Sequence, residues 1–541
     1  MSNPLYDRLF APLASSDAPF LRFADGTAIG RAGFLAMAHR AAFALRACGV
    51  VPGDRVAAQV EKSPEALALY AGCVIAGAVF LPLNPGYTPA ELAYFVGDAA
   101  PRLLVMDSRG LDSRGSESSA ADAQAADGWA AIAAAQGTRV ETLDAAGAGS
   151  FRRLCETQPD HGPVAARGDD DLAALLYTSG TTGRAKGAML SQRNLCSNAE
   201  TLAAAWRFGA DDVLLHALPI FHTHGLFVAT HTVLASGASM LFLPGFDREA
   251  ILRLLPQASV LMGVPTFYTR LLDDARFDRA RVAHMRLFVS GSAPLLAETH
   301  RAFEERTGHR ILERYGMTET NMNTSNPYAG ERRAGTVGPP LPGVEIAIVD
   351  PERGTPLAPG ETGLVLVRGP NVCRGYWNQP EKTREALRED GFFVTGDLGH
   401  LDADGYLVLI GRQSDLIISG GFNVYPKEVE QVLDDVPDVL ESAVIGVPHP
   451  DFGEAVLAVL VAATNAGAGA EVETAIGAAL ERSLARYKHP KALVWLPALP
   501  RNAMGKVQKA LLRERCAGRF APVPAASDAA ASGAAGTGRT G

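Results

Sequence analysis

The chain has 541 residues, of which 47% are hydrophobic and 20% charged, and its formal net charge is −9. This length allows about three or four compact units with large buried cores. The negative balance excludes nonspecific nucleic-acid binding and a basic membrane face as expected roles. The six cysteines are scattered without a CxxC pair, so we expect reduced thiols in the cytoplasm, with neither a zinc site nor disulfides.

Apolar runs and Ala-rich amphipathic segments alternate along the chain, as in an α/β protein. The apolar stretch 66–83 contains Gly, Cys and Pro, so it predicts a helix followed by a core strand and no membrane span. The Ala-, Ser-, Asp- and Gly-rich residues 108–170 predict a surface excursion, and residues 517–541 predict a disordered tail. Further strands are expected at residues 103–106, 240–243, 287–289 and 364–367.

The most informative segment is LLYTSGTTGRAKG at residues 175–187, where an apolar strand runs into a loop of glycines, hydroxyls and a lysine. Glycines let a backbone approach phosphate oxygens closely, hydroxyls donate hydrogen bonds, and a lysine adds a point charge. The spacing is not that of a Walker loop, and the alternative is a flexible surface turn. The candidate phosphate ligands are Thr178, Ser179, Gly180, Thr181, Thr182, Gly183 and Lys186.

Four later segments carry candidate ligands for the rest of a nucleotide. They are ILERYGMTET at 311–320, GFFVTGDLG at 391–399, GRQSDLIISGGFNVYPKEVE at 411–430 and LPRNAMGKVQKALL at 499–512. A carboxylate is the ligand that Mg²⁺ prefers beside phosphate, and a carboxylate also suits the two hydroxyls of a ribose. Each segment taken alone is also compatible with an ordinary turn or capped helix.

In this order the segments resemble the motifs of the adenylate-forming superfamily, which includes acyl-CoA synthetases, adenylation domains and luciferases. With FLPLNPGYTPAEL at 80–92, the resemblance extends over most of the chain. It implies an α/β fold with a large, multi-subdomain N-terminal adenylation domain at residues 1–412. A small, mobile α+β lid domain at 413–516 follows, and then the tail at 517–541.

The resemblance also implies roles for single residues. Tyr315 is expected to stack on the adenine, and Glu319 and Thr178 to hold Mg²⁺. Asp397 is expected to bind the ribose hydroxyls with help from Arg412. The remaining expected ATP contacts are Ser292, Ala293, Pro294, Glu313, Arg314, Gly316, Met317 and Thr318.

Lys506 matches the superfamily's adenylation lysine, so Lys506 and Glu319 are the expected catalytic residues. The superfamily moves its small domain between two half-reactions, which withdraws this lysine and opens a tunnel for coenzyme A. Gly420, Gly421 and Phe422 are the expected contacts of coenzyme A. The pivot position holds Ser414 where relatives usually have Asp or Lys, and a pivot needs backbone freedom more than one side chain.

Three segments around the expected acyl site resemble malonyl-CoA synthetases: HALPIFHTHGLFVATH at 216–231, VLMGVPTFYTRLL at 260–272 and MRLFVSGSAPLL at 285–296. Burying the second carboxylate of malonate is costly unless a cation or several donors meet it. Arg286 is the predicted anchor because a guanidinium grips a carboxylate with two parallel bonds. The alternative is that Arg286 serves the fold. His222, Thr223 and Ser290 are the other predicted substrate contacts.

The predicted activity is ATP-dependent ligation of malonate to coenzyme A through malonyl-adenylate, giving malonyl-CoA, AMP and pyrophosphate. The resemblance leaves two other enzymes open. One is an acyl-CoA synthetase for methylmalonate or another short-chain or aromatic acid, and the other is an adenylation domain that loads a carrier protein. A nucleotide-binding scaffold without catalysis is disfavoured because Lys186, Glu319, Asp397, Arg412 and Lys506 are all present. Partners are therefore expected to be ATP, malonate and coenzyme A, with no nucleic acid and no stable membrane insertion.

Overall fold

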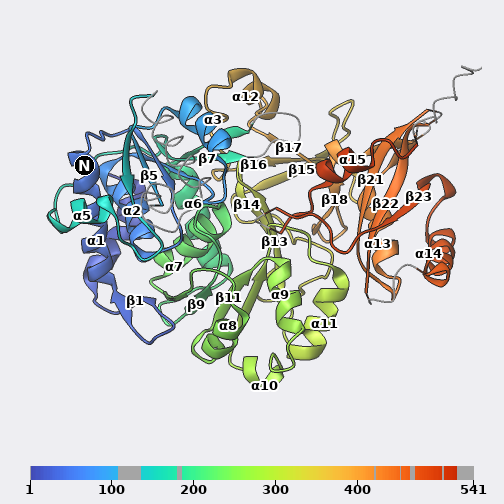
Figure 1. Cartoon of the computed structure of the whole chain (residues 1–541), viewed down its shortest axis with the longest axis horizontal. Coiled ribbons are helices and arrows are strands. Elements are labelled where there is room, and N and C mark those ends of the chain that lie inside the picture. The colour runs from blue at the N-terminus through green and yellow to red at the C-terminus, as the bar shows by residue number, and fades with distance from the viewer. Residues whose placement is uncertain are drawn as a thin grey trace, which may run out of the picture. The chain divides into compact units, whose positions relative to one another are not determined.

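The computed structural model describes residues 2–107, 136–178, 185–419, 422–450, 452–463, 469–502 and 505–520. The chain divides into two compact units (Figure 1). The large unit extends to Ser414 and includes Gly505 and Lys506, and the small unit begins at Asp415 and takes the remaining C-terminal residues. The α/β architecture with a large N-terminal and a small C-terminal domain is the one that the sequence predicts.

A six-stranded sheet forms the first of three sheets in the large unit, in the order β6-β5-β3-β4-β7-β8. Its neighbouring strands are parallel except β8, which is antiparallel to β7. The strands are β3 (Arg55–Gln59), β4 (Val79–Pro82), β5 (Leu103–Met106), β6 (Arg139–Thr142), β7 (Leu172–Thr178) and β8 (Lys186–Ser191).

The predicted surface excursion at 108–170 is wrong for its second part. Strand β6 and helix α5 (Ser150–Glu156) lie in it, and β6 pairs in parallel with β5. A short edge strand with polar residues gives no apolar run, which is why composition alone missed it. Residues 108–135 lie outside the described residues.

The second sheet of the large unit has eight strands, in the order β14-β13-β12-β11-β9-β10-β1-β2. Its strands from β13 to β1 are parallel, and β14 and β2 add antiparallel edges. Parallel strands end at a common edge, which is where α/β sheets bind ligands. The strands are β1 (Pro19–Arg22), β2 (Ala28–Gly30), β9 (Val213–His216), β10 (Ser239–Phe242), β11 (Val260–Gly263), β12 (Leu287–Ser290), β13 (Leu312–Met317) and β14 (Asn321–Ser325).

Helices cover these two sheets, and Figure 1 shows α8 to α11 gathered around the green strands of the second one. The longer helices are α1 (Arg31–Ala47), α2 (Pro64–Ala76), α3 (Pro89–Ala99), α6 (Gln192–Ala205) and α11 (Ala297–Thr307). The shorter helices are η1 (Tyr6–Phe10), η2 (Ala11–Ser15), η4 (His224–Thr230), α7 (His231–Ser236), α8 (Arg248–Leu254), η5 (Leu255–Gln257), α9 (Pro265–Leu272), α10 (Arg279–Val282) and α12 (Pro380–Ala386).

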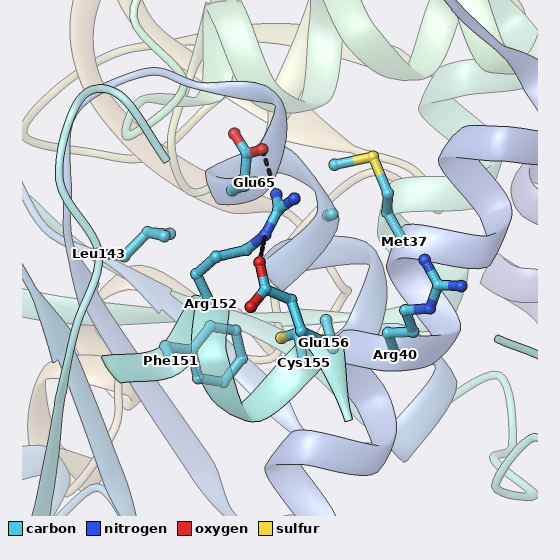
Figure 2. Close-up of a pocket in the computed structure, with 10 residues that line it drawn as sticks. Met37, Arg40, Glu65, Leu143, Phe151, Arg152, Cys155 and Glu156 are labelled. Atoms are coloured by element: carbon cyan, nitrogen blue, oxygen red, sulfur yellow. Dashed lines mark hydrogen bonds and ion pairs between the residues drawn. The ribbon is translucent and has the colours of Figure 1, made fainter. Parts of the chain in front are cut away.

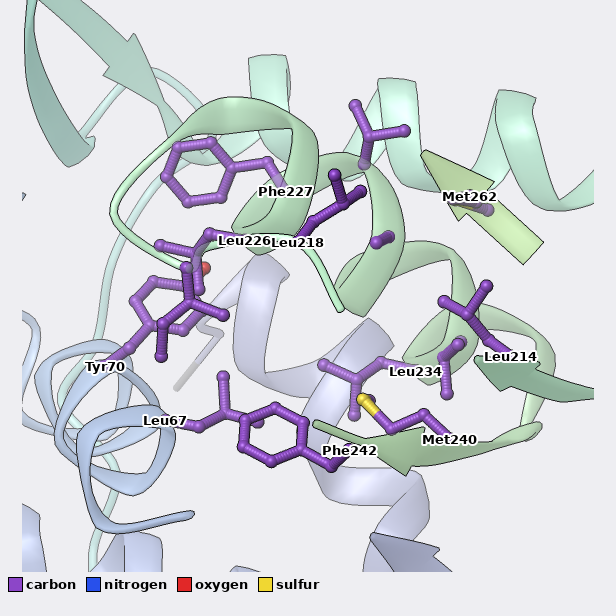
Figure 3. Close-up of a cluster of buried hydrophobic side chains, with 14 of the residues drawn as sticks. Leu67, Tyr70, Leu214, Leu218, Leu226, Phe227, Leu234, Met240, Phe242 and Met262 are labelled. Carbon is purple, nitrogen blue, oxygen red and sulfur yellow. The ribbon is translucent and has the colours of Figure 1, made fainter. Parts of the chain in front are cut away.

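One apolar core joins the two sheets, and Figure 3 shows part of it. Tyr70 comes from α2, Leu214 from β9, Phe227 from η4 and Phe242 from β10. Helix α2 starts where the hydroxyl of Ser63 accepts a hydrogen bond from the backbone N–H at position 66, which caps the first turn. The elements that carry the site therefore rest on a shared apolar core.

A four-stranded antiparallel sheet completes the large unit, in the order β15-β16-β17-β18. Its strands are β15 (Glu345–Val349), β16 (Gly363–Arg368), β17 (Phe393–Leu401) and β18 (Leu407–Arg412). The register of β17 and β18 places Asp397 directly opposite Arg412. The short helix η6 (Gln413–Asp415) follows, at the division between the units.

The small unit has its own sheet, in the order β20-β19-β22-β21, with β23 parallel to β22. Alternate residues of β21 point to two apolar clusters, so that Val444 packs with α13 and Ile445 packs with α15. Its elements are β19 (Ile417–Ser419), β20 (Phe422–Val424), α13 (Pro426–Asp434), β21 (Val439–His449), β22 (Gly453–Ala462), α14 (Ala470–Ser483), η7 (Arg486–Lys488), β23 (Ala492–Trp495) and α15 (Lys509–Cys516). Of the helices that the structure describes, none combines the length and apolarity that a membrane span requires.

Candidate active site

The turn after β12 lies at the edge where the parallel strands end. Ser292 has a φ of 73°, in the left-handed region that side chains rarely adopt, and such strain is common at functional sites. Its Oγ lies 3.1 Å from Nδ1 of His224. A Cβ added to Gly291 would come 2.4 Å from Cζ of Arg314, so this backbone lies directly against the guanidinium. The turn therefore brings β12, β13 and η4 together.

Arg314 is a buried cation at this edge, with 4% of its surface exposed. Among the residues that the structure describes, its Nε and Nη2 have no hydrogen-bond partner. Removal from water lowers the pKa of Arg314 to about 9, so it still carries its charge at neutral pH. A buried charge of this kind is costly unless an anion meets it, which makes Arg314 a candidate ligand contact.

Neutral histidines lie near this charge. Burial lowers the pKa of His222 to about 3, with contributions from Lys506 and Arg314, and burial beside Arg314 holds the pKa of His224 well below its ordinary value. Nε2 of His224, Oγ1 of Thr223 and Oγ of Ser290 are buried and have no hydrogen-bond partner in the described part of the chain. These neutral groups and the one guanidinium suit a polar, anionic ligand.

Arg286 is not part of this cluster around Arg314. It precedes β12, and its Nε and Nη2 each donate a 2.6 Å hydrogen bond to a different carboxylate oxygen of Asp212. Its Nη1 donates to the carbonyl of Trp206 at 2.9 Å, and its guanidinium carbon lies 5.0 Å and 5.3 Å from the ring centres of Phe208 and Tyr328. The contacts therefore argue against the predicted role of Arg286 as carboxylate anchor, because the Nε and Nη2 edge that would grip a carboxylate already binds Asp212.

The predicted magnesium ligands meet between β7 and β13. Oγ1 of Thr178 donates to Oε1 of Glu319 at 3.3 Å, and the hydroxyl of Tyr376 donates to the same oxygen at 3.0 Å. Nζ of Lys186 lies 4.9 Å from the ring centre of Tyr376. No group of three or more acidic, His or Cys side chains suited to a metal occurs in the described ranges. One carboxylate with hydroxyls fits Mg²⁺ that is held mainly by phosphate oxygens.

The predicted ribose ligand lies on the four-stranded sheet. Nε of Arg412 contacts Oδ1 of Asp397 at 2.7 Å, and the hydroxyl of Tyr315 donates to Oδ2. The backbone N–H of Asp397 donates to Oγ1 of Thr395 at 2.9 Å. Burial and the neighbouring carboxylate raise the pKa of Tyr315 well above its ordinary value, so the phenol stays protonated as a donor. Stacking of Tyr315 on adenine stays a prediction.

Lys506 groups with the large unit. Removal from water lowers its pKa, the charge of Arg412 lowers it further, and the carboxylates of Asp397 and Glu319 act in the opposite direction. Lys506 in turn contributes to the low pKa of His222. This lysine is therefore within electrostatic reach of Glu319, Asp397 and His222.

The other predicted contacts are placed as follows. Glu313 is buried on β13, and Ala293 and Pro294 follow Ser292 in its turn. Gly316 is packed so closely that a Cβ there would come 1.8 Å from the carbonyl oxygen of Asn321. Met317 ends β13, and Thr318 follows it. In the small unit, the exposed ring of Phe422 stacks on Tyr487 with centres 4.8 Å apart. Outside the described residues lie Ser179, Gly180, Thr181, Thr182, Gly183, Gly420 and Gly421.

Sequence reasoning missed Tyr376 and Thr395. Tyr376 is 57 positions from Glu319 and lies outside the quoted motifs, so no local pattern indicates the contact. Thr395 lies inside GFFVTGDLG, two residues before the aspartate whose N–H it accepts. The short spacing is typical of a hydroxyl that bonds nearby backbone, and this signal was available in the sequence.

A separate hollow lies between α1, α2 and α5 and is shown in Figure 2. Arg152 crosses it and contacts Glu65 at 2.6 Å and Glu156 at 3.1 Å. Burial raises the pKa of the Cys155 thiol to about 12, so the thiol is unreactive at neutral pH. The hollow contains no predicted site residue; Arg152 pairs with Glu65 and Glu156, and Arg40 pairs with Asp160 outside the hollow at 3.3 Å.

Known proteins share the sequence families and the fold of this chain. The chain matches the AMP-binding enzyme family over residues 12–377 and the AMP-binding enzyme C-terminal domain over 428–506. ATP-bound MatB from Rhodopseudomonas palustris is 52% identical with a TM-score of 0.89, covering 96% of this chain and 100% of that one.

Two curated relatives are each 36% identical. The malonate–CoA ligase of Arabidopsis thaliana aligns with 86% of this chain and 78% of its own. The feruloyl-CoA synthase of an Amycolatopsis species aligns with 91% of this chain and 94% of its own. The shared identity and the two matched domains lead to one conclusion: the chain belongs to the AMP-binding enzyme family.

Proposed function

We propose that this protein ligates malonate to coenzyme A with ATP, through malonyl-adenylate, and releases pyrophosphate and AMP. The observation that carries the choice of acid is Arg314, to which we give this role in place of the ATP contact expected from the sequence. Its guanidinium is buried, retains its charge and has nitrogens without partners among the described residues. An apolar acid would leave that charge unmatched, whereas the second carboxylate of malonate would meet it.

The relatives support the chemistry more strongly than they support the acid. A malonate–CoA ligase and a feruloyl-CoA synthase are both 36% identical to this chain. Identity at that level therefore does not select between a small dianion and an aromatic acid. The polar surroundings of Arg314, with neutral His222 and His224, favour the dianion.

The nucleotide would be held at two places. The carboxylate of Asp397 is oriented by Arg412 and Tyr315 and retains acceptor capacity for the two ribose hydroxyls. Glu319 and Thr178 would hold Mg²⁺ beside the phosphates, where the ion supplies charge neutralisation for departing pyrophosphate.

In the first half-reaction one carboxylate oxygen of malonate attacks the α-phosphorus of ATP, and the bond to pyrophosphate breaks. Lys506 would bridge the carboxylate and phosphate oxygens and offset their repulsion as they approach. Arg314 would hold the other carboxylate, so only one end of the acid reaches the phosphorus. Positioning and charge neutralisation therefore supply the catalysis.

In the second half-reaction the thiol of coenzyme A attacks the adenylate carbonyl, and AMP leaves. We expect the small unit to turn about the chain near Ser414, where the two units divide, and so to withdraw Lys506. Gly420, Gly421 and Phe422 would then contact coenzyme A. Serine at the pivot is compatible with this motion because a hinge needs backbone freedom.

The test is coenzyme A-dependent AMP formation from ATP with malonate, methylmalonate, acetate, butyrate and benzoate. We expect malonate to be preferred, and Arg314→Met to lose that preference while its affinity for ATP stays unchanged. A preference for a monocarboxylate that is indifferent to Arg314→Met would keep the ligase chemistry and overturn the assignment of malonate.

A further inference from the structure

Lys62 is a second buried cation of the large unit, and it has no carboxylate partner among the described residues. It follows β3 of the six-stranded sheet, yet its ammonium lies at the end of β9 in the other sheet. Nζ lies 2.8 Å from the carbonyl oxygen of His216, 2.9 Å from that of Leu218 and 3.0 Å from Nδ1 of His216. Nζ also lies 4.4 Å from the ring centre of Phe242.

The hydrogen bonds assign one positive charge to Lys62 and His216 together. Nε2 of His216 lies 3.0 Å from the carbonyl oxygen of Gly225, which only accepts, so Nε2 carries a hydrogen. In a neutral imidazole Nδ1 then accepts, and the three N–H groups of the Lys62 ammonium each have an acceptor. The other arrangement, an imidazolium beside a neutral amine, carries the same total charge.

This network closes the loop that carries the acyl-site histidines. Residues 217–223 leave the end of β9 and return into η4, which begins at His224. Lys62 binds carbonyls at the start of the loop, and His216 binds the carbonyl of Gly225 at its end. Gly225 is packed so tightly that an added Cβ would come 2.0 Å from the carbonyl oxygen of Pro219. Both ends of the loop are therefore held in one place.

We propose that Lys62, acting with His216, is a positioning residue that fixes this loop so that His222 and His224 face the acid. The inference rests on the proposed function, in which His222 and His224 of this loop lie beside the bound acid. Lys62 contributes no contact to the acid in this proposal, because its donors are all used by the loop.

The surroundings make these bonds hard to replace. Figure 3 shows the apolar side chains of Leu218, Leu226 and Phe242 in the cluster around the loop. A buried carbonyl that loses its donor in such a place is left unsatisfied unless the backbone moves. Loss of the ammonium should therefore displace the loop.

The variant is Lys62→Met, which keeps most of the length of the side chain and removes charge and donors. We expect the KM for the acid to rise about tenfold or more, while the KM for ATP changes less than about twofold. The double variant Lys62→Met with His216→Gln should raise the KM for the acid no more than the worse single change does, because both residues act through one network.

Asn3→Leu is the matched control for lost stability. The Asn3 amide is buried and also donates to two carbonyls, those of Val74 at 2.9 Å and Ala165 at 3.0 Å, but it does not touch the loop. We expect it to lower the melting temperature without raising the KM for the acid. If Lys62→Met behaves like Asn3→Leu in both measurements, the proposal is overturned.

Thr230→Val serves if Lys62→Met does not fold. The Thr230 hydroxyl donates to the same Gly225 carbonyl at 3.0 Å, so its loss should raise the KM for the acid about two- to fivefold. An unchanged KM in a folded Thr230→Val protein overturns the proposal.

The kinetics are run with whichever acid the wild type uses best. A wild type that prefers an acid other than malonate defeats the proposed function alone, because the variants still report on the loop. If the wild type prefers malonate and Lys62→Met leaves the KM for malonate unchanged, only the loop proposal is overturned.

Discussion

Two arginines at opposite ends of the parallel strands in the eight-stranded sheet, one half-buried and one buried, have different partners. At the edge where the parallel strands begin, Arg286 forms a fork with Asp212, and Ser259 donates to the same carboxylate at 2.7 Å. At the edge where they end, Arg314 has nitrogens without hydrogen-bond partners in the described residues.

The difference distinguishes a charge that stabilises the fold from a charge that is available to a ligand. A buried ion pair whose members satisfy each other holds elements together and has nothing left for a ligand. A buried cation with unused donors is costly to the fold and is retained where a ligand completes it. We therefore expect changes at the first edge to affect stability, and changes at the second to affect catalysis.

Lys506→Met should give the largest effect. We expect adenylate formation from malonate and ATP to slow about a hundred- to a thousandfold, because a positive charge aimed at converging oxygens is lost. Pyrophosphate release in a single turnover measures this step. Thioester formation from supplied malonyl-adenylate and coenzyme A is the control, and equal loss in both steps would contradict the assigned role.

Arg314→Met and Arg286→Met together test the comparison directly. Removing Arg314 should reduce kcat/KM for malonate roughly 30- to 150-fold. This corresponds to a loss of about 2 to 3 kcal/mol of transition-state stabilisation, because the bound carboxylate loses its partner. Steady-state kinetics measure this loss, with the KM for ATP as the internal control.

Removing Arg286 should instead destabilise the large unit by about 1 to 3 kcal/mol, because Asp212 is left without its cation. The free energy of urea unfolding measures this cost, and kcat/KM for malonate in the folded variant should stay near the wild-type value. The opposite pattern, with activity lost in Arg286→Met and retained in Arg314→Met, would reverse the meaning of the two edges.

Asp397→Asn tests whether the nucleotide side is separate from the acid side. We expect the affinity for ATP to fall by about 2 kcal/mol, roughly thirtyfold, since an amide accepts more weakly than a carboxylate from ribose hydroxyls. Equilibrium ATP binding is the measurement. The preference among acids should persist, and a changed preference would mean that the two sides are coupled.

Acidification should lower stability in two separate pH ranges, one set by a buried histidine and one by Asp212. Burial lowers the pKa of His231 to about 3, below the value of about 6.5 of an unfolded histidine, so the unfolded state binds more protons between these values. Stability is therefore lost as pH falls, by about 1 kcal/mol from this residue between about pH 7 and 5.5.

His231→Gln should remove that share of the pH dependence, as measured by urea unfolding at both pH values. For Asp212, burial alone would raise the pKa, but its hydrogen bonds with Arg286, Ser259 and the backbone N–H of Gly209, together with the charge of Arg286, outweigh burial and lower it. The stability due to Asp212 should therefore be lost only below about pH 4, the pKa of an unfolded aspartate. A wild-type curve that is flat from pH 7 to 5.5 would contradict the neutral state of the buried histidines.

Much of the fold was readable from local sequence, which also brought the candidate nucleotide ligands to attention. The predicted strand 103–106 matches β5, and the stretch 66–83 forms helix α2 and strand β4. These predictions succeeded because periodicity and turn residues act over a few positions. Strand β6 was missed because a short polar edge strand is held by its pairing with β5.

The acyl site was less readable, because it depends on which charges are already paired. Arg286 and Arg314 both precede or lie in apolar strands, and charge logic alone favoured Arg286. Its partner Asp212 is 74 positions away in the sequence, so the ion pair has no local signal.

The sequence by itself determined the chemical inventory: hydroxyls, carboxylates and lysines in an order typical of adenylate-forming enzymes, on an α/β frame. Only the tertiary structure decided which cation is left for a ligand and which loop is fastened by Lys62. The physical reason is that the availability of a buried charge depends on its neighbours, and parallel strands bring those neighbours together from distant parts of the chain.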